Sequence, residues 1–86
     1  MATHNLKMLP EYFQSVTLGN KTFELRKNDR DYRIGDIVNL CEYFDGKYTG
    51  YEIKAIITYV LKNCPEYGLD KDYCVFSFTV LSDNFS

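Results

Sequence analysis

The sequence predicts an α+β fold, a small closed or nearly closed β-barrel of five or six strands with one helix after the first strand. The 86 residues suffice for a single domain over residues 1–86 and are too few for two. From Lys21 onward apolar residues recur at every second position, which is typical of strands, and the one helical spacing precedes that point. The last strand is apolar on both faces, and closing a sheet into a barrel encloses one of them.

The first two elements are a short strand and a helix. Residues 5–9 alternate between polar and apolar side chains, which predicts a strand. Segment 10–18 begins with proline, whose missing N–H has no partner in the first helical turn anyway. Phe13 and Val16 share one face of this helix, and Gly19 supplies a left-handed C-cap.

Four strands follow the helix, separated by segments rich in turn residues. In the first of them Phe23 and Leu25 point to one face, while Thr22, Glu24 and Arg26 point to the other. Gly, Pro, Asn and Asp mark the connections. The strands are expected at residues 22–26, 37–44, 51–61 and 73–82, and the connections at 27–32, 34–36, 45–50 and 64–72, the last as a loop or a single helical turn.

The predicted core combines the helical stripe with alternate residues of two strands. Phe13 and Val16 are expected to pack against Phe23 and Leu25. The last strand is expected to contribute Cys74, Phe76, Phe78 and Val80.

Composition predicts a folded, soluble protein. Hydrophobic residues make up 45% of the chain and charged residues 26%, which suits a packed globular domain. No apolar run approaches the ~20 residues of a membrane helix, and the N-terminus has no signal-peptide pattern. A cytoplasmic location is therefore expected.

Cysteine and histidine usage gives no indication of a metal or a cofactor. Three cysteines cannot all pair within one chain, and none has metal-binding spacing. Cys41 and Cys74 lie in apolar runs and are expected to act as small buried hydrophobic residues, whereas Cys64, before Pro65, is expected in an exposed loop. The single histidine, His4, is expected to serve packing.

Charge is distributed unevenly. A net charge of −2 counts against a general nucleic-acid binder, because such binding depends on neutralising phosphates. Residues 21–33 nevertheless hold five of the ten Lys and Arg residues against three of the twelve acidic ones. This segment could form a local anion site or a solvated strand face whose charges pair internally.

The candidate site lies within residues 19–30. A glycine ends the helix, the next strand places Thr22, Glu24 and Arg26 on one side, and Lys21 stands at the strand entrance. A carboxylate, a guanidinium and an ammonium group within one cleft could bind the edge of a nucleobase and its phosphate. The alternative is a set of salt bridges on a wet surface.

Polar, aromatic and glycine positions within residues 4–60 form a pattern with a known counterpart. They are His4, Lys7, Tyr12, Phe13, Gly19, Lys21, Thr22, Phe23, Glu24, Arg26, Asn28, Asp29, Arg30, Gly35, Asp36, Glu42, Tyr43, Tyr48, Thr49 and Gly50. In these residues the sequence resembles the ASCH (activating signal cointegrator homology) superfamily, whose members have a PUA-like β-barrel. More narrowly, it is similar to a small subfamily of it associated with phages and bacteria.

The resemblance implies a PUA-like barrel with a cleft lined by residues 21–26, in which RNA is expected to bind by analogy with PUA domains. Tyr43, Tyr48 and Tyr51 could stack bases or simply pack. The expected partner is RNA or a nucleotide-like ligand, with no metal, cofactor or membrane. The site residues expected for this ligand are Lys21, Thr22, Glu24, Arg26, Asn28, Arg30 and Tyr48.

Two other functions stay open. One bacterial ASCH branch hydrolyses N4-acetylcytidine with a lysine, a threonine three residues later and a more distant glutamate. Lys21 matches that lysine, but Glu24 stands at the position of the threonine, and a carboxylate cannot replace a hydroxyl nucleophile without a new mechanism. The alternatives to RNA binding are thus an amidohydrolase-like activity on a modified nucleoside and a protein-interaction module without a ligand.

Overall fold

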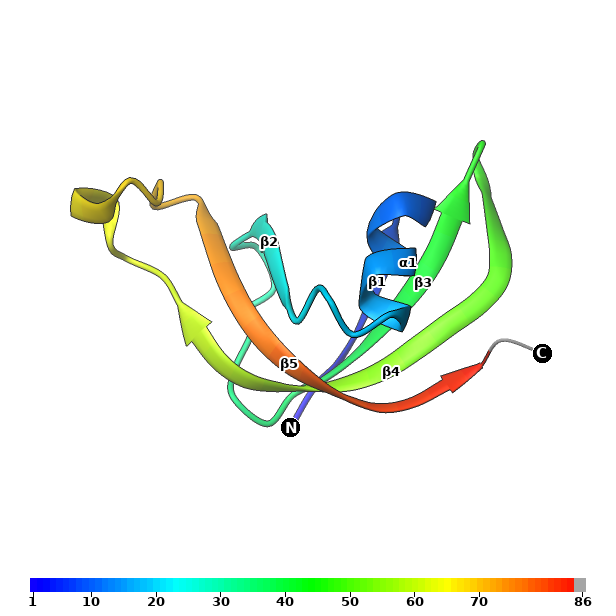
Figure 1. Cartoon of the computed structure of the whole chain (residues 1–86). Helices are drawn as coiled ribbons and strands as arrows, with labels where there is room; N and C mark the ends of the chain where they lie inside the picture. Colours follow the sequence, from blue (N-terminus) through cyan, green and yellow to red (C-terminus); the bar gives the residue numbers. More distant parts are fainter. Residues whose placement is uncertain (85–86) are drawn as a thin grey trace.

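One curved sheet and one α-helix make up most of the structure, a computed structural model that describes residues 1–84. The sheet bends into an open half-barrel, and the helix lies inside the bend (Figure 1). The predicted α+β class, with the helix after the first strand, is confirmed. The elements are β1 (Thr3–Met8), α1 (Pro10–Thr17), β2 (Phe23–Lys27), β3 (Ile37–Phe44), β4 (Lys47–Leu61), the 3-10 turn η1 (Pro65–Tyr67) and β5 (Tyr73–Asn84).

The strand order β1-β3-β4-β5-β2 leaves β1 and β2 as the two edges of the sheet. β1 pairs with β3 in parallel, and the other pairs are antiparallel. The closure expected of a barrel is therefore only half achieved. Arginine side chains bridge the gap: Arg26 Nη2 donates to the carbonyl oxygen of Lys7 at 2.6 Å, and Arg30 Nη1 donates to that of Asn5 at 2.9 Å.

Helix α1 starts and ends as its sequence predicts. Pro10 occupies the first turn, and Gly19 adopts a φ of +78° just past the C-cap. The amides of Gly19 and Asn20 donate to the carbonyls of Val16 and Ser15 at 3.0 and 2.9 Å, which is the hydrogen-bond pattern of a Schellman motif. The helix therefore stops sharply, and the chain turns back toward the sheet at Lys21.

The β3–β4 hairpin is tighter than the sequence analysis proposes. Asp45 and Gly46 have φ values of +53° and +78°, as the two central residues of a type I′ turn require. The turn therefore takes two residues, and β4 begins at Lys47, where residues 45–50 were expected to form a longer connection.

The core lies between the helix and the concave face of the sheet. Phe13 and Val16 of α1 are buried in it as predicted. Val80 is expected in the core from the sequence, but it is 41% exposed. β2 pairs with β5 only as far as Ser77, so Val80 lies beyond the last residue of its neighbour on that side. The other buried residues of the core are Leu6, Met8, Tyr32, Val38, Leu40, Ile53, Ala55, Ile57, Cys74, Phe76 and Phe78.

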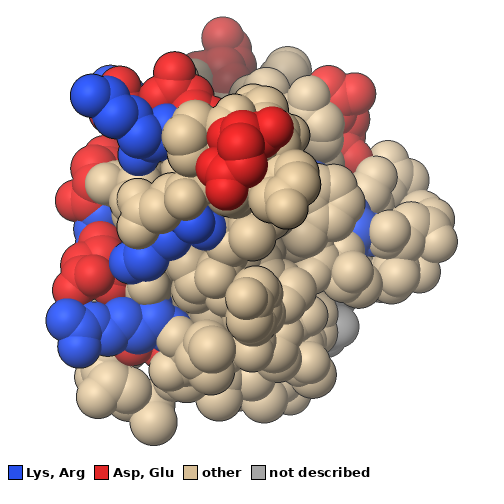
Figure 2. Space-filling view, turned by 90° about the vertical axis from the view of Figure 1, so that its left-hand side faces the viewer, with Lys and Arg blue, Asp and Glu red and all other residues tan. Residues whose placement is uncertain are grey.

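The orientation of β2 is a second correction. Phe23 and Leu25 are 50% and 57% exposed, although the sequence analysis places both in the core. The alternation itself is right, but the charged face turns inward: Glu24 is only 6% exposed. The partners of its carboxylate make this burial tolerable. Figure 2 views the molecule from this side and shows a broad uncharged area with charged side chains of both signs along its margin.

Burial also corrects the expectation for one cysteine. Cys74 is fully buried and Cys41 partly so, but Cys64 is buried as well rather than exposed. It immediately precedes η1, and its carbonyl accepts a hydrogen bond from the Tyr67 amide at 3.1 Å, so it is part of a closed turn rather than an open loop. Among the side chains that the structure describes, residues 1–82, no group of three or more His, Cys, Asp or Glu residues is arranged to hold a metal ion. No helix in that range has both the length and the apolar character to cross a bilayer.

Candidate functional site

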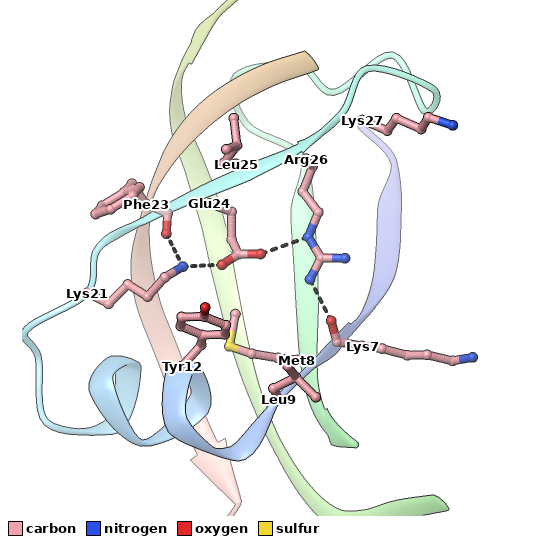
Figure 3. Close-up of a pocket in the computed structure, with 10 residues that line it drawn as sticks. All are labelled: Lys7, Met8, Leu9, Tyr12, Lys21, Phe23, Glu24, Leu25, Arg26 and Lys27. Carbon is pink, nitrogen blue, oxygen red and sulfur yellow. Dashed lines mark hydrogen bonds and ion pairs between the residues drawn. The ribbon is translucent and has the colours of Figure 1, made fainter. Parts of the chain in front are cut away.

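An open cleft of about 560 Å³ lies between β2, the start of α1 and the end of β1 (Figure 3). It opens on the gap between the two edge strands, so incomplete closure of the sheet creates the space. Its lining combines apolar and aromatic side chains with charged ones. The lining residues are Lys7, Met8, Leu9, Tyr12, Lys21, Phe23, Glu24, Leu25, Arg26 and Lys27.

Glu24 is the centre of the cleft's charged network. Its carboxylate points from β2 into the cleft, with Lys21 on one side and Arg26 on the other. Oε1 accepts a hydrogen bond from Lys21 Nζ, and Oε2 accepts one from Arg26 Nε at 2.7 Å. Each oxygen of this buried carboxylate thus has a cationic partner, which meets the requirement for burying a charge.

Lys21 reaches Glu24 because the Schellman motif fixes the chain just before it. The Lys21 amide donates to the carbonyl of Ser15 at 3.0 Å, and its ammonium group donates to the carbonyl of Phe23 at 2.6 Å. The ammonium group also lies 5.0 Å from the Phe23 ring centre and 5.9 Å from that of Tyr12, within the range of cation–π attraction. The cation is therefore held by a carboxylate and two aromatic rings at once.

Arg26 joins the network to the opposite edge of the sheet. Its Nε donates to Glu24 and its Nη2 donates to the Lys7 carbonyl, which uses two of the five N–H groups of a guanidinium. Among residues 1–82, whose side chains the structure describes, the other N–H groups of Arg26 have no hydrogen-bonding partner. They are available to a ligand in the cleft, and a guanidinium binds carboxylate or phosphate in a forked geometry.

The network carries net positive charge on an acidic protein. Lys21 and Arg26 outnumber Glu24 by one charge, while the whole chain has a net charge of −2. Lys7 and Lys27 also line the cleft, and their ammonium groups extend away from it at the rim. The cleft is therefore suited to a ligand with an anionic group and a flat or apolar part that can lie against Tyr12 and its neighbours.

The other expected site residues do not line this cleft. Thr22 is exposed, and its carbonyl accepts a hydrogen bond from the Phe78 amide at 3.1 Å. Asn28 donates through its backbone amide to the Asp72 carbonyl at 2.8 Å, and Arg30 donates to β1. Tyr48 lines a separate depression of about 310 Å³ with Asn5, Cys41, Gly50, Tyr51 and Glu52. Of the seven expected residues, the cleft brings together Lys21, Glu24 and Arg26.

Sequence reasoning missed the wall opposite β2. Met8, Leu9 and Tyr12 face Glu24 across the cleft, at the junction of β1 and α1. The signal in the sequence was the position of Tyr12 beside the helical stripe of Phe13 and Val16, but a flanking aromatic residue is an ordinary feature of an amphipathic helix. In the structure Tyr12 is 47% exposed.

A second buried polar cluster lies outside the cleft. His4 Nε2 and Asp36 Oδ2 are hydrogen-bonded at 2.8 Å, and Asp36 also accepts from the amides of Ala2 at 3.0 Å and Arg33 at 3.1 Å. His4 packs on the Tyr32 ring with 4.7 Å between ring centres, so the expected packing histidine is also a hydrogen-bonding partner. This cluster anchors the start of β1 to the turn before β3.

Protonation of Asp36 is expected to weaken the fold. Burial raises the pKa of this carboxyl, but the hydrogen bonds from Ala2, His4 and Arg33 outweigh it, so the pKa lies below its ordinary value. A depressed carboxyl pKa contributes stability above the unfolded pKa of about 4, and this stability is lost as the pH falls through the lower folded value. Urea unfolding at a series of pH values from neutral to acid should therefore show that the free energy of unfolding falls below about pH 4, and that it falls less in Asp36→Asn than in the wild type. Asp45→Asn, in an exposed turn, is the matched control, and an equal acid loss in wild type and Asp36→Asn would contradict the assignment.

Two comparisons place the chain among known proteins. Residues 3–78 match the model of a family described as a domain of unknown function, DUF3850. A protein of Escherichia phage P2, described as an uncharacterized 12.9 kDa protein in the GpA 3′ region, is 42% identical over 55 residues. That similarity covers 64% of this chain and 50% of the phage protein, so the chain matches about half the length of this relative.

Proposed function

The chain belongs to the DUF3850 family, and we propose that its cleft binds RNA or a nucleotide-like ligand. The observation that carries the proposal is the Lys21–Glu24–Arg26 network, which is held inside the cleft with a positive charge in excess. Spare N–H groups of Arg26 would bind a phosphate, and Tyr12 or Phe23 would contact a base. A volume of about 560 Å³ suits one nucleotide unit rather than a folded duplex.

We further propose that the family is related to the ASCH superfamily and its PUA-like fold. The half-barrel with a helix after the first strand supports this relationship, as does a cleft lined by the segment around residues 21–26. The relationship would place the ligand in the same cleft that the charge network marks.

Binding is expected to be modest and only weakly sensitive to salt. Few phosphates fit the cleft, so the slope of log affinity against log salt concentration for short single-stranded RNA should be about −1 to −3. Fluorescence anisotropy measures the binding of a labelled RNA pool. Chemical-shift titration separately measures the binding of nucleoside monophosphates. Lys21→Gln and Arg26→Gln should weaken binding at least tenfold, while the exposed Lys71→Gln should not.

The controls separate a lost contact from a lost fold. Each variant is melted beside the wild type, and binding is compared only among variants that remain folded at the assay temperature. No binding of either probe at low salt would overturn the proposal and favour a protein-interaction module. Equal weakening by Lys71→Gln would indicate general attraction to positive charge and would also contradict a site in the cleft.

One observation favours the amidohydrolase-like alternative: an ammonium group and a carboxylate are in contact inside the cleft. Glu24 would act as a general base toward water and Lys21 would stabilise the developing oxyanion. Each oxygen of Glu24 accepts one hydrogen bond from a cation and keeps a second lone pair that could accept a proton from water. Release of acetate from N4-acetylcytidine, abolished in Glu24→Gln, would favour this alternative over binding alone.

A further inference from the structure

The convex side of the arm formed by β2, β5 and the end of β4 presents an exposed apolar surface. Among its members, Phe23, Leu25 and Tyr59 are 50%, 57% and 59% exposed. Leu61 and Tyr73 are 44% and 42% exposed. We name this surface the outer apolar face, and it consists of Phe23, Leu25, Tyr59, Leu61, Tyr73 and Val75.

Strand register shows that these side chains are neighbours. Val75 of β5 stands opposite Leu25 of β2 on one side and Leu61 of β4 on the other, which makes one apolar row across three strands. Phe23 and Tyr59 flank Ser77 in the next row. Since residues paired across a ladder share a face, the rows form one continuous surface.

An irregularity in β4 turns Tyr59 outward. The register with β5 shifts between Ile57 and Tyr59, so two residues of β4 oppose one of β5 at this point. Ile57 is buried, and Tyr59, two positions later, is exposed instead of following it inward. The bulge thus directs a large aromatic side chain onto a surface that is already apolar.

The size of the outer apolar face is sufficient for a homodimer interface. Three half-exposed aromatic residues and two half-exposed leucines present on the order of 500 Å² of exposed area. If this is the apolar share of an interface that is about 65% apolar, the whole interface would cover about 800 Å² per partner, the usual size of a stable protein interface.

The low positive charge of the face argues against a nucleic acid or an anionic membrane as its occupant. Lys27, at the end of β2, pairs with Tyr73 across the ladder. A single cation on the face is too little positive charge to bind a nucleic acid or an anionic membrane surface. Charges of both signs border the face. Lys62 follows Leu61 in the sequence, Asp72 precedes Tyr73, and Lys27 pairs with Tyr73 across the ladder. A rim of mixed sign permits contact with a copy of itself, because two-fold symmetry can place a cation of one chain against an anion of the other.

We infer that a second copy of this chain packs on the outer apolar face to form a two-fold symmetric dimer. The two sheets lie face to face about 10 Å apart, with the Leu25–Val75–Leu61 row near the axis. Glu24 and Arg26 point to the opposite side of β2, so the charged network of each cleft lies away from the interface. Phe23 and Leu25 belong to both, since they form the edge of the cleft as well as part of the face. This inference does not rest on the proposed ligand.

Sedimentation velocity from about 1 to about 200 µM tests the inference, because dimer formation follows mass action. The wild type should rise from the mass of one chain to that of two. Tyr59→Glu and Leu61→Glu should each weaken association at least about a hundredfold, because two-fold symmetry introduces the charge twice. Ile34→Glu is the matched control: Ile34 is 63% exposed and lies outside the face, so this variant should dimerise like the wild type.

Thermal melting verifies that each variant is folded, which is expected because the substituted side chains are exposed. A wild-type chain that stays monomeric over the whole range would overturn the inference. So would a dimer that persists in both Tyr59→Glu and Leu61→Glu, since its interface would then lie elsewhere. Loss of the dimer in Ile34→Glu alone would overturn it for the same reason.

Discussion

Replacing Phe76 with alanine is expected to lower the free energy of unfolding by about 3–5 kcal/mol, the range for a truncated core aromatic residue. Phe76 is completely buried in β5, and its ring centre lies 4.9 Å from that of Tyr32 and 6.4 Å from that of Phe78. Close-packed neighbours on a sheet cannot collapse into the space that the ring leaves, so the lost burial is joined by the cost of a cavity. Urea unfolding at neutral pH measures the change.

Phe23→Ala is the matched control, because the same side chain is removed from a half-exposed position on β2. Measured at a protein concentration at which the chain is monomeric, its cost should be below about 1 kcal/mol, as for most substitutions away from the core. Equal costs for the two variants would mean that β2 faces the core with Phe23 and that the orientation of the charged network is wrong. A small cost for both would place β5 outside the core.

Removing the carboxylate of Glu24 is expected to have the second largest effect. Glu24→Ala leaves Lys21 and Arg26 as two partly buried cations without an anion between them, at a cost of about 2–4 kcal/mol. The cleft is open, so solvent screening reduces the penalty below that of a fully enclosed pair. Arg26→Ala should also destabilise, because Glu24 then keeps one cationic partner and Lys7 loses a donor to its carbonyl.

A double-mutant cycle separates this network from independent surface charges. Glu24→Ala combined with Arg26→Ala should show a coupling energy above about 0.5 kcal/mol, as residues that share a network do. The matched control cycle combines Asp31→Ala with Arg33→Ala, an ion pair whose side chains are 65% and 74% exposed, and should be close to additive. Additivity in both cycles would show that Glu24 and Arg26 do not form a working pair in solution.

Local chemistry made the helix and one strand predictable. Proline at the start of α1 and glycine after its end act through φ and hydrogen-bond requirements that hold in any fold. The strand at residues 37–44 is bounded by Gly35-Asp36 on one side and Asp45-Gly46 on the other, and β3 has the predicted limits. The grouping of Lys21, Glu24 and Arg26 was also accessible, because alternation alone places Glu24 and Arg26 on one face.

Local chemistry does not predict which face of β2 meets the core or how far the sheet closes. Alternation along β2 separates Phe23 from Glu24 but does not tell which side meets the core, and the usual preference for apolar burial fails because Glu24 has two cationic partners inside. The bulge before Tyr59 depends on pairing with β5, which is remote in sequence. Strand order, and therefore the gap between β1 and β2, depends on contacts of the same long-range kind.

The arginine bridges across that gap affect how the protein can move. Strands joined by a backbone ladder keep a spacing of about 4.8 Å, whereas β1 is joined by long, rotatable side chains to Arg26 of β2 and to Arg30 of the loop that follows β2. The strand order within residues 1–84 places no ladder across this gap, so separating the two edges there breaks side-chain hydrogen bonds but no ladder hydrogen bond. The guanidinium of Arg26 lines the cleft and also holds the two edges together, so an anion bound by its remaining N–H groups is attached directly to the contact that spans the gap.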